Sequence, residues 1–157
     1  MHFGVLTISD GVSQGTRVDT AGNWLCEHCA LIGTVERKWV ADEVDHIAAA
    51  LRTWVDQGIE VILTTGGTGL GPRDVTPEAT RLVLNREVPG IAEALRQASL
   101  KYTPYAMLSR GLAGVSGTAL IVNLPGSLTA VAQLYPLLEP IFTHARSLLA
   151  GQTSHEK

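Results

Sequence analysis

Residues 59–78 read Ile59-Glu-Val-Ile-Leu-Thr-Thr-Gly-Gly-Thr-Gly-Leu-Gly-Pro-Arg-Asp-Val-Thr-Pro-Glu78. The stretch begins with a short, unbroken apolar run, Val61 to Leu63, which is typical of a parallel strand buried on both faces. Four glycines follow within positions 66–71. Glycine permits backbone conformations that are closed to other residues, and it lets the backbone come close to a ligand. The pattern therefore predicts a buried strand that runs into a glycine-rich loop.

The glycine-rich loop is suited to binding phosphate. Successive backbone N–H groups in such a loop form a nest for anions, and ligands of open α/β sheets bind at the carboxyl ends of strands. Thr76 is typical of a helix N-cap and Pro77 of a first helical residue. Asp74 lies between the loop and this predicted helix. The stretch as a whole predicts a phosphate-binding corner with an acidic residue beside it.

The loop matches neither of the two common phosphate-binding motifs. A P-loop ends in Gly-Lys-Ser/Thr, and the stretch contains no lysine. A dinucleotide fingerprint would stand in the first β-α unit, whereas Gly67-Thr-Gly69-Leu-Gly71 lies in the third predicted unit. P-loop ATPases and ordinary dehydrogenases are therefore disfavoured.

Length and composition indicate a single globular domain. The 157 residues are 45% hydrophobic and 17% charged, and we expect a domain over residues 1–151 followed by a polar tail, 152–157. The net charge of -3 gives no reason to expect binding to nucleic acid or to an anionic membrane. There is no apolar run long enough to span a bilayer and no signal-peptide pattern at the start, so a cytoplasmic location is expected.

Cys26 and Cys29 form a lone C-x-x-C pair. A redox pair or half of a zinc site is one interpretation. A redox pair would favour the start of a helix, whereas these residues lie late in a predicted helix, and no second cysteine pair or suitable histidine pair exists. We therefore expect two small buried side chains on a helix face. Core packing is likewise expected for Trp24, Trp39 and Trp54.

Strand and helix patterns alternate along the chain. This alternation predicts an α/β fold: a single three-layer domain with a mostly parallel sheet and helices on both faces, Rossmann-like without the dinucleotide fingerprint. The second strand alternates in polarity and should lie nearer an edge. Strands are expected at 3–8, 35–40, 59–63 and 119–124, and helices at 20–32, 44–57, 76–86, 89–101 and 127–150. Residues 9–19 are expected to form a loop, residues 102–117 an irregular or hairpin-like segment, and Pro136 and Pro140 should kink or split the last helix.

The ends of these strands should bring polar residues together. The first strand is followed by Ser9 and Asp10, the second by Asp42, and the last by residues 125–127. Each has a simpler interpretation, because Ser9 and Asp10 suit turns, and Asp42 and Ser127 suit helix caps. Two carboxylates beside a glycine nest at one sheet edge nevertheless favour a ligand site.

The sequence resembles the molybdopterin adenylyltransferases of molybdenum cofactor synthesis, from Gly4-Val-Leu-Thr-Ile-Ser-Asp10 to about Leu149. The most specific block is Thr65-Gly-Gly-Thr-Gly-Leu-Gly-Pro-Arg-Asp-Val-Thr-Pro-Glu78, which is also found in related molybdenum insertases and in a competence-associated domain. Two further blocks, Ser99-Leu-Lys-Tyr-Thr-Pro-Tyr-Ala-Met-Leu-Ser-Arg110 and Leu120-Ile-Val-Asn-Leu-Pro-Gly126, in a chain this short, resemble the stand-alone adenylyltransferase.

The resemblance implies transfer of AMP from ATP to the terminal phosphate of molybdopterin, with Mg²⁺ and release of pyrophosphate. It places the catalytic and metal-binding carboxylates at Asp42 and Asp74. It places molybdopterin contacts at Thr65, Gly66, Gly67, Thr68, Gly69, Ser109, Arg110, Asn123, Pro125 and Gly126, and nucleotide contacts at Ser9, Asp10, Asp19 and Gly22. It also implies a homotrimer and a molybdenum insertase as partner.

The chain departs from the family pattern at two places. Asp19-Thr-Ala-Gly22 stands where the family often has Asp-Arg-Ser-Gly, so Ala21 removes a hydroxyl near the nucleotide, although Thr20 could substitute for it. Ser127-Leu128 stands where the family often has Asn-Pro or Lys-Pro. The alternative function is a catalytically inactive paralogue that binds molybdopterin or a partner protein. The presence of both Asp42 and Asp74 favours the enzyme.

Overall fold

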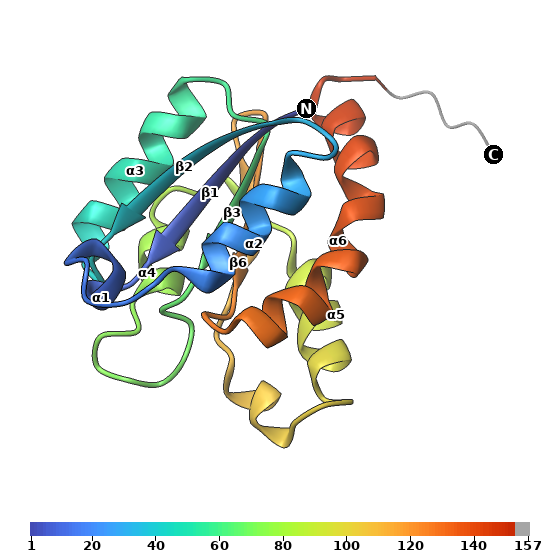
Figure 1. The fold of residues 1–157 in the computed structure, drawn as a ribbon. Helices are drawn as coiled ribbons and strands as arrows, with labels where there is room; N and C mark the ends of the chain where they lie inside the picture. Colours follow the sequence, from blue (N-terminus) through green and yellow to red (C-terminus); the bar gives the residue numbers. More distant parts are fainter. Residues whose placement is uncertain (153–157) are drawn as a thin grey trace.

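The computed structural model describes residues 1–152, and its six strands form one sheet with helices on both faces (Figure 1). The predicted α/β architecture is therefore confirmed. Of the predicted tail, residues 153–157 lie outside the described residues. The strands are β1 His2–Ile8, β2 Thr34–Val40, β3 Val61–Thr65, β4 Arg86–Glu87, β5 Ala113–Ser116 and β6 Ala119–Leu124. The helices are α1 Asp10–Ser13, α2 Thr20–Cys29, α3 Val44–Asp56, α4 Thr76–Arg81, α5 Pro89–Ser99, the 3-10 helix η1 Pro104–Leu108 and α6 Leu128–Leu149.

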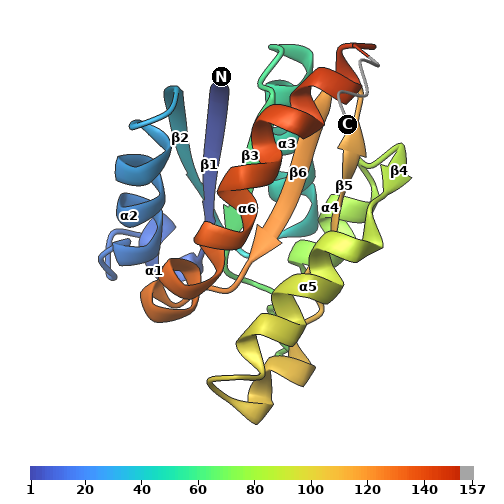
Figure 2. The same cartoon turned by 90° about the vertical axis from the view of Figure 1, so that its right-hand side faces the viewer.

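The strand order places a switch point between β1 and β3. The sheet runs β2-β1-β3-β6-β5-β4, and β1 pairs in parallel with both β2 and β3, as β3 does with β6. From β1 the chain passes through α2 to β2 on one side, and from β3 it goes on to strands on the other side (Figure 2). The crevice outside the carboxyl ends of β1 and β3 is where such a sheet binds ligands.

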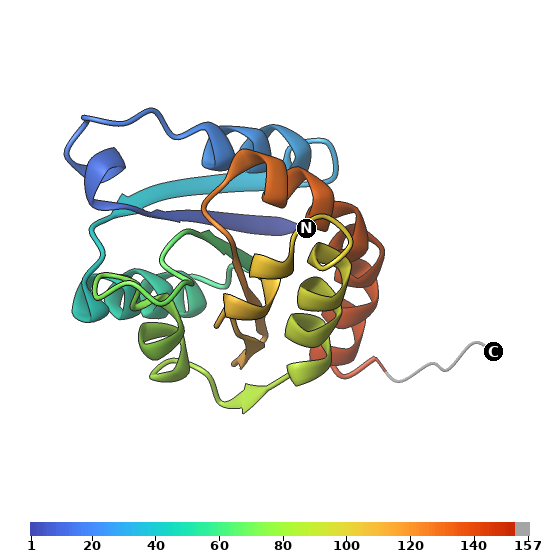
Figure 3. The same ribbon diagram turned by 90° about the horizontal axis from the view of Figure 1, so that it is seen from below.

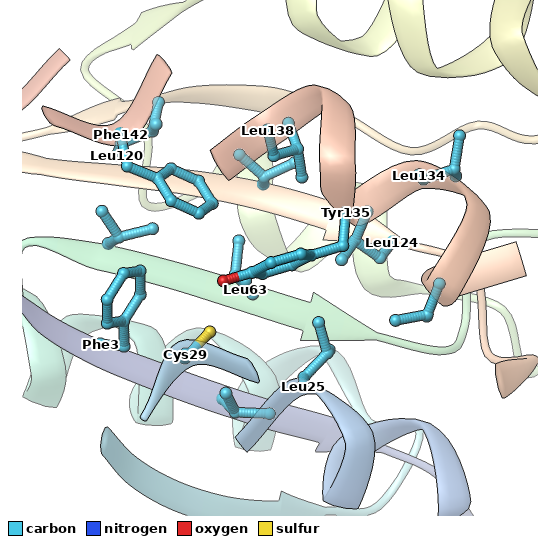
Figure 4. Packing of buried hydrophobic residues seen from close by; sticks show 14 of the residues in the cluster. Phe3, Leu25, Cys29, Leu63, Leu120, Leu124, Leu134, Tyr135, Leu138 and Phe142 are labelled. Carbon is cyan, nitrogen blue, oxygen red and sulfur yellow. The ribbon is translucent and has the colours of Figure 1, made fainter. Parts of the chain in front are cut away.

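Two apolar clusters cover the two faces of the sheet. One cluster joins α2, α5 and α6 to the sheet, and it includes Leu95 of α5. Figure 4 shows Leu25 of α2 and Tyr135 of α6 in this cluster. The other joins α3 and α4 to the opposite face through residues such as Trp54 and Ala79. Every residue of β3 and β6 is buried, whereas β2 is partly exposed at the edge, as predicted. The site at the strand ends therefore rests on a rigid, doubly covered sheet.

Several predicted bounds were wrong. The expected loop 9–19 contains α1, because the Ser9 hydroxyl accepts a hydrogen bond from Val12 N and caps a short helix. The helix expected over 20–32 ends at Cys29, and the one expected over 76–86 ends at Arg81. Arg86 and Glu87 instead form β4, paired antiparallel with β5. The hairpin-like excursion is confirmed, since β5 pairs antiparallel with β6.

The prediction of two buried cysteines is confirmed for Cys29, whereas Cys26 is only partly buried. Both are free thiols, and Cys29 is fully buried in the cluster that includes α2 and α6. Burial raises the pKa of Cys29 to about 12, and burial also raises the pKa of Cys26. Neither thiol is therefore activated at neutral pH.

Core packing of the three tryptophans is only partly confirmed. Trp54 is fully buried, and Trp24 is partly buried against the core and stacks on His28. The prediction for Trp39 was wrong, since this side chain on edge strand β2 is 50% exposed. Its indole N–H donates to Asp19, and the Arg37 guanidinium lies over its ring. The Trp39 side chain is therefore held by polar contacts with Asp19 and Arg37 and not by packing in the apolar core.

Helix α6 continues through Pro136 and Pro140 over 22 residues. Its ribbon changes direction between the first turns and the remainder, so the predicted kink is confirmed and a split into two helices is not (Figure 1). Even this helix is not apolar enough to cross a membrane, and within residues 1–152 no other helix is long and apolar enough to do so.

Candidate functional site

The glycine loop after β3 approaches the end of β1 closely. Gly66 and Gly67 have φ angles of 103° and 65°, in the region that favours glycine. A Cβ on Gly66 would collide with the carbonyl oxygen of Ile8. Glycine is therefore required here both by conformation and by space, and Figure 3 shows the green loop leaving the sheet from the end of β3.

The carbonyl groups of this loop are held, while its N–H groups are free. Thr76 N and its hydroxyl donate to the carbonyls of Gly67 and Gly66, and Arg110 N and Nε donate to those of Thr68 and Gly69. Within residues 1–152, the N–H groups of residues 67–69 have no protein acceptor. The loop thus presents three unpaired donors at the end of β3, which is the arrangement that binds phosphate.

Thr76 does not act as the predicted helix cap. Helix α4 has Val75 at its N-cap position, with no side-chain capping bond. The Thr76 side chain is fully buried, and its hydroxyl donates to the Gly66 carbonyl at 2.8 Å. Its role is therefore to fasten the glycine loop.

Asp42 and Asp74 each use one carboxylate oxygen within the protein. Asp42 Oδ2 accepts from Asp10 N at 2.8 Å, and Asp74 Oδ2 accepts from Gly71 N at 2.8 Å. Asp42 was also expected as a possible helix cap, but Glu43 occupies the cap position of α3. In the part of the chain that the structure describes, the Oδ1 atoms of both residues accept no hydrogen bond.

Burial raises the pKa of Asp42. The N–H of Asp10 and the charge of Arg73 lower it, while the nearby charges of Asp10 and Asp74 raise it further. The mutual repulsion of Asp42 and Asp74 means that a cation between them would be favoured. No cluster of three or more His, Cys, Asp or Glu side chains suited to a metal occurs among residues 1–152. A metal ion here would therefore need substrate or water oxygens beside the two carboxylates.

Arg73 joins the ends of β1 and β2 to the glycine loop. Its Nε and Nη2 donate to the two carboxylate oxygens of Asp10 at 3.0 Å, and its Nη1 lies 2.9 Å from Glu43 Oε1. Asp10 and Asp42 in turn exchange backbone-to-carboxylate hydrogen bonds. The backbone and carboxylate of Asp10 therefore both hold Asp42 in place.

Asp19 is buried and accepts four donors. These are Gly22 N at 2.8 Å, the Thr7 hydroxyl at 2.6 Å, Arg37 Nη2 at 2.7 Å and the Trp39 indole at 3.1 Å. Desolvation raises its pKa, but these hydrogen bonds outweigh it, so the pKa of Asp19 is lowered overall. Asp19 caps α2 and fixes the loop that precedes it.

The glycine loop, both carboxylates and the β1–α2 segment line one open cleft of about 300 Å³. Ten of the residues expected at the site lie on its wall: Ser9, Asp19, Asp42, Thr65, Gly66, Gly67, Thr68, Gly69, Asp74 and Gly126. Thr20, in the loop expected to reach the nucleotide, lines it too, and so do Thr7 and Arg17, which were not expected there. Arg17 stands two residues before Asp19 in the same loop, and this position in the sequence could have indicated that it lies at the site.

Six expected residues do not line this cleft: Asp10, Gly22, Ser109, Arg110, Asn123 and Pro125. Ser109, Asn123 and Pro125 line a second cavity of about 20 Å³, which is too small for a pterin. The Asn123 amide donates to Thr64 and Thr80 inside the core. Arg110 supports the loop from behind, through the Gly69 and Asp74 carbonyls and the Glu78 carboxylate.

Comparison with known proteins agrees with the family resemblance found in the sequence. Over residues 4–144 the chain matches the protein family described as "Probable molybdopterin binding domain". It is 38% identical over 156 residues to the molybdopterin adenylyltransferase of Helicobacter pylori strain J99, covering 96% of this chain and 89% of that protein. The crystal structure of the molybdopterin biosynthesis enzyme MoaB from Thermus thermophilus is similar at a TM-score of 0.84 and 47% identity, over 96% of both chains.

A larger relative contains the same domain. The chain is 44% identical over 160 residues to the molybdenum cofactor synthesis protein cinnamon of Drosophila melanogaster. The match covers 97% of this chain but 26% of cinnamon, so the chain spans about a quarter of that protein.

Proposed function

The chain belongs to the family of probable molybdopterin-binding domains, and from this premise we propose that it is a molybdopterin adenylyltransferase. The reaction transfers AMP from Mg-ATP to the terminal phosphate of molybdopterin and releases pyrophosphate. One observation carries the proposal. The same cleft contains the unbonded N–H groups of residues 67–69 and the free Oδ1 atoms of Asp42 and Asp74. The N–H groups suit a phosphate, and the carboxylates suit its counter-cation.

The reaction needs placement more than a strong base. A phosphate monoester has a second pKa of about 6, so the terminal phosphate of molybdopterin is mostly a dianion at neutral pH. Its oxygen can attack the α-phosphorus of ATP without losing a proton to the protein. Charge neutralisation and in-line positioning are then the main requirements. The free N–H groups of the glycine loop bind and orient the attacking phosphate in this proposal.

Asp42 and Asp74 fit a magnesium site. Mg²⁺ prefers oxygen ligands and is held by one or two carboxylates together with substrate phosphates and water, and these two residues supply two free carboxylate oxygens. When bound, Mg²⁺ would neutralise phosphate charge. The fixed positions of the two carboxylates, through Asp10 N and Gly71 N, would set the orientation of the triphosphate.

The two substrates are proposed to use different walls of the cleft. The glycine loop and Gly126 hold the phosphate of molybdopterin, and the β1–α2 segment with Ser9 lies on the nucleotide side. Asp10, Asp19 and Gly22 act on the nucleotide side by positioning, because both carboxylates are already hydrogen-bonded within the protein and Gly22 N binds Asp19. Ser109, Arg110, Asn123 and Pro125 are proposed to shape the molybdopterin side from behind the loop.

Pyrophosphate release tests this function directly. Wild-type protein should release pyrophosphate from Mg-ATP only when molybdopterin is added. Asp74→Asn should keep the fold and bind molybdopterin but lose most turnover, roughly 100-fold or more, because one oxygen ligand of the metal becomes neutral. Near wild-type turnover in this variant would contradict the assignment. Binding of molybdopterin by the wild type without any pyrophosphate release would identify a catalytically inactive binding protein.

We also propose that the chain forms a homotrimer and passes its product to a molybdenum insertase. Large apolar side chains such as Leu31, Tyr105 and Met107 are 81%, 76% and 68% exposed, which leaves surface for assembly. The occurrence of this domain within the longer protein cinnamon supports a neighbouring activity. Light scattering should give three times the 16.7 kDa of one chain, and a 16.7 kDa particle would contradict the trimer.

A further inference from the structure

Four arginines surround the site, and three of them are paired with carboxylates. Arg37 is bound to Asp19, Arg73 to Asp10 and Glu43, and Arg110 to Glu78. Across residues 1–152, Arg17 is in no ion pair and its side chain donates no hydrogen bond to the protein. It is also the only cationic side chain on the described wall of the cleft.

The backbone of Arg17 is fixed although its side chain is free. The N–H groups of Thr16 and Arg17 both donate to the Gly11 carbonyl, at 2.9 and 3.0 Å, and fold the segment back on α1. A Cβ on Gly11 would lie 3.1 Å from Arg17 Cβ, so the glycine leaves room for the aliphatic stem of Arg17. The side chain of Arg17 therefore extends from a fixed backbone at the wall of the cleft.

The cleft has an excess of negative groups without this arginine. Its wall carries the carboxylates of Asp19, Asp42 and Asp74, and ATP would add a triphosphate. In the proposed function, the unpaired N–H groups at residues 67–69 bind the attacking phosphate of molybdopterin. The two free carboxylate oxygens bind the cation that neutralises the phosphate charge. The β- and γ-phosphates, which leave together, have no other charged partner on the described wall.

We propose that Arg17 binds the β- and γ-phosphates of ATP and so recognises the pyrophosphate leaving group. This inference rests on the proposed function. In the transfer, an oxygen of the molybdopterin phosphate forms a bond to the α-phosphorus, and the bond from the α-phosphorus to the bridging oxygen breaks. The electron pair of that bond leaves with pyrophosphate. A guanidinium can bind two phosphate oxygens at once and stabilise this growing charge.

Equilibrium binding of defined nucleotides tests the assignment. The probes are Mg²⁺ complexes of α,β-methylene-ATP and of inorganic pyrophosphate, with AMP and adenosine as short probes. Arg17→Gln should weaken binding of the first two by roughly 10- to 100-fold, the range for charge-assisted hydrogen bonds, and should leave AMP and adenosine unchanged. Arg17→Lys should fall between, because lysine keeps the charge without the planar fork.

Arg52→Gln is the matched control, since it removes an equal charge from an exposed position on α3, where Arg52 reaches only the Leu82 carbonyl. Its probe affinities should equal those of the wild type. Unchanged pyrophosphate affinity in Arg17→Gln, beside an active wild type, would overturn the inference alone. An equal loss for AMP but not for adenosine would overturn it in favour of contact with the α-phosphate, and an equal loss for both would overturn it in favour of contact with the base or ribose. A wild type that neither binds α,β-methylene-ATP nor releases pyrophosphate would overturn the proposed function and the inference with it.

Discussion

Gly69 has no side chain, and the space that a Cβ would fill lies 2.9 Å from Asp74 Oδ2. Its φ angle is not positive, so alanine can adopt the backbone conformation. Gly69→Ala should therefore leave the stability nearly unchanged but displace the Asp74 carboxylate from its bond to Gly71 N. A shift of about 1 Å in a catalytic group can cost about 100-fold in rate, and we expect molybdopterin-dependent pyrophosphate release to fall by about that factor.

Gly90→Ala provides the control for this prediction. Gly90 lies in α5, and nothing lies within 4 Å of a Cβ built on it. Its turnover should match the wild type, and its stability should rise by about 0.5–1 kcal/mol because alanine favours helix. Full activity in Gly69→Ala would show that the carboxylate position of Asp74 does not limit the reaction.

Asp19 should contribute to stability in a pH-dependent way. Its pKa is lowered in the folded protein, so the ionised carboxylate favours the native state at pH values above the unfolded pKa, about 3.9. This contribution is lost as the pH falls through the lower folded pKa. Asp19→Asn leaves Arg37 without its partner and should reduce the free energy of unfolding by about 2–3 kcal/mol at pH 7. Urea denaturation at pH 7 and pH 3 should show the difference between the two proteins shrinking at acid pH.

Residue types alone could not separate cap residues from site residues. Ser127 caps α6 as expected, because its hydroxyl accepts a hydrogen bond from Ala130 N in the first turn. Thr76 and Asp42 are equally good capping types, yet both bond to loops that arrive from other parts of the chain. Such long-range partners leave no local pattern in the sequence. Arg17 was missed because the inference about it rests on the lack of an ion-pair partner within residues 1–152, which the sequence does not reveal.

At the scale of elements, periodic apolar patterns predicted the covered helices and buried strands well. Helix α3 begins at Val44 as expected and buries Leu51 and Trp54 on one face. Short elements were missed, since the four residues of α1 and the two of β4 carry no periodicity. They form only because Ser9 caps one and β5 pairs with the other.

The prolines of α6 lead to a prediction about this helix. Pro140 is exposed and lies inside the helix, where it cannot donate to the Pro136 carbonyl four residues earlier. Pro140→Ala should restore that hydrogen bond and stabilise the protein by about 1 kcal/mol, raising Tm by about 2–4 °C. Glu139→Ala, at an exposed neighbouring position, should change Tm by less than about 1 °C. A lower Tm for Pro140→Ala would indicate that the bend itself improves packing on the sheet.

At the scale of the whole molecule, topology explains why the site lies where it does. In the order β2-β1-β3-β6, the chain moves from β1 to a strand on one side of the sheet and from β3 to strands on the other side. Only there can the loops after β1 and β3 separate and leave a cleft between them. The alternation of strands and helices predicted the parallel sheet, and the convergence of strand ends, together with the family resemblance that added Asp19, predicted ten of the cleft residues. The second cavity beside Asn123 could not be predicted, because its walls come from α5, residues 109–111, the end of β6 and Leu134 of α6, which meet only in the folded protein.

Binding at the cleft should stabilise the whole fold. A ligand that binds only the folded state, at about 100 times its Kd, adds about 2.7 kcal/mol to the free energy of unfolding. For a chain of this size, that corresponds to a rise in Tm of about 5–10 °C with Mg-ATP. EDTA should remove most of this rise, because without the cation Asp42 and Asp74 repel the triphosphate. Scanning calorimetry with ATP, with and without Mg²⁺, measures the effect.

The Asp42→Asn and Asp74→Asn variants provide the sharper comparison. Each variant lowers the repulsion but also removes a cation ligand, so ATP should stabilise it by a similar, small amount with or without Mg²⁺. The wild type should instead show a large difference between the two conditions. A full Mg²⁺-dependent rise in both variants would contradict a metal site at these carboxylates. It would leave the glycine loop, with its free N–H groups at residues 67–69, as the main source of phosphate binding.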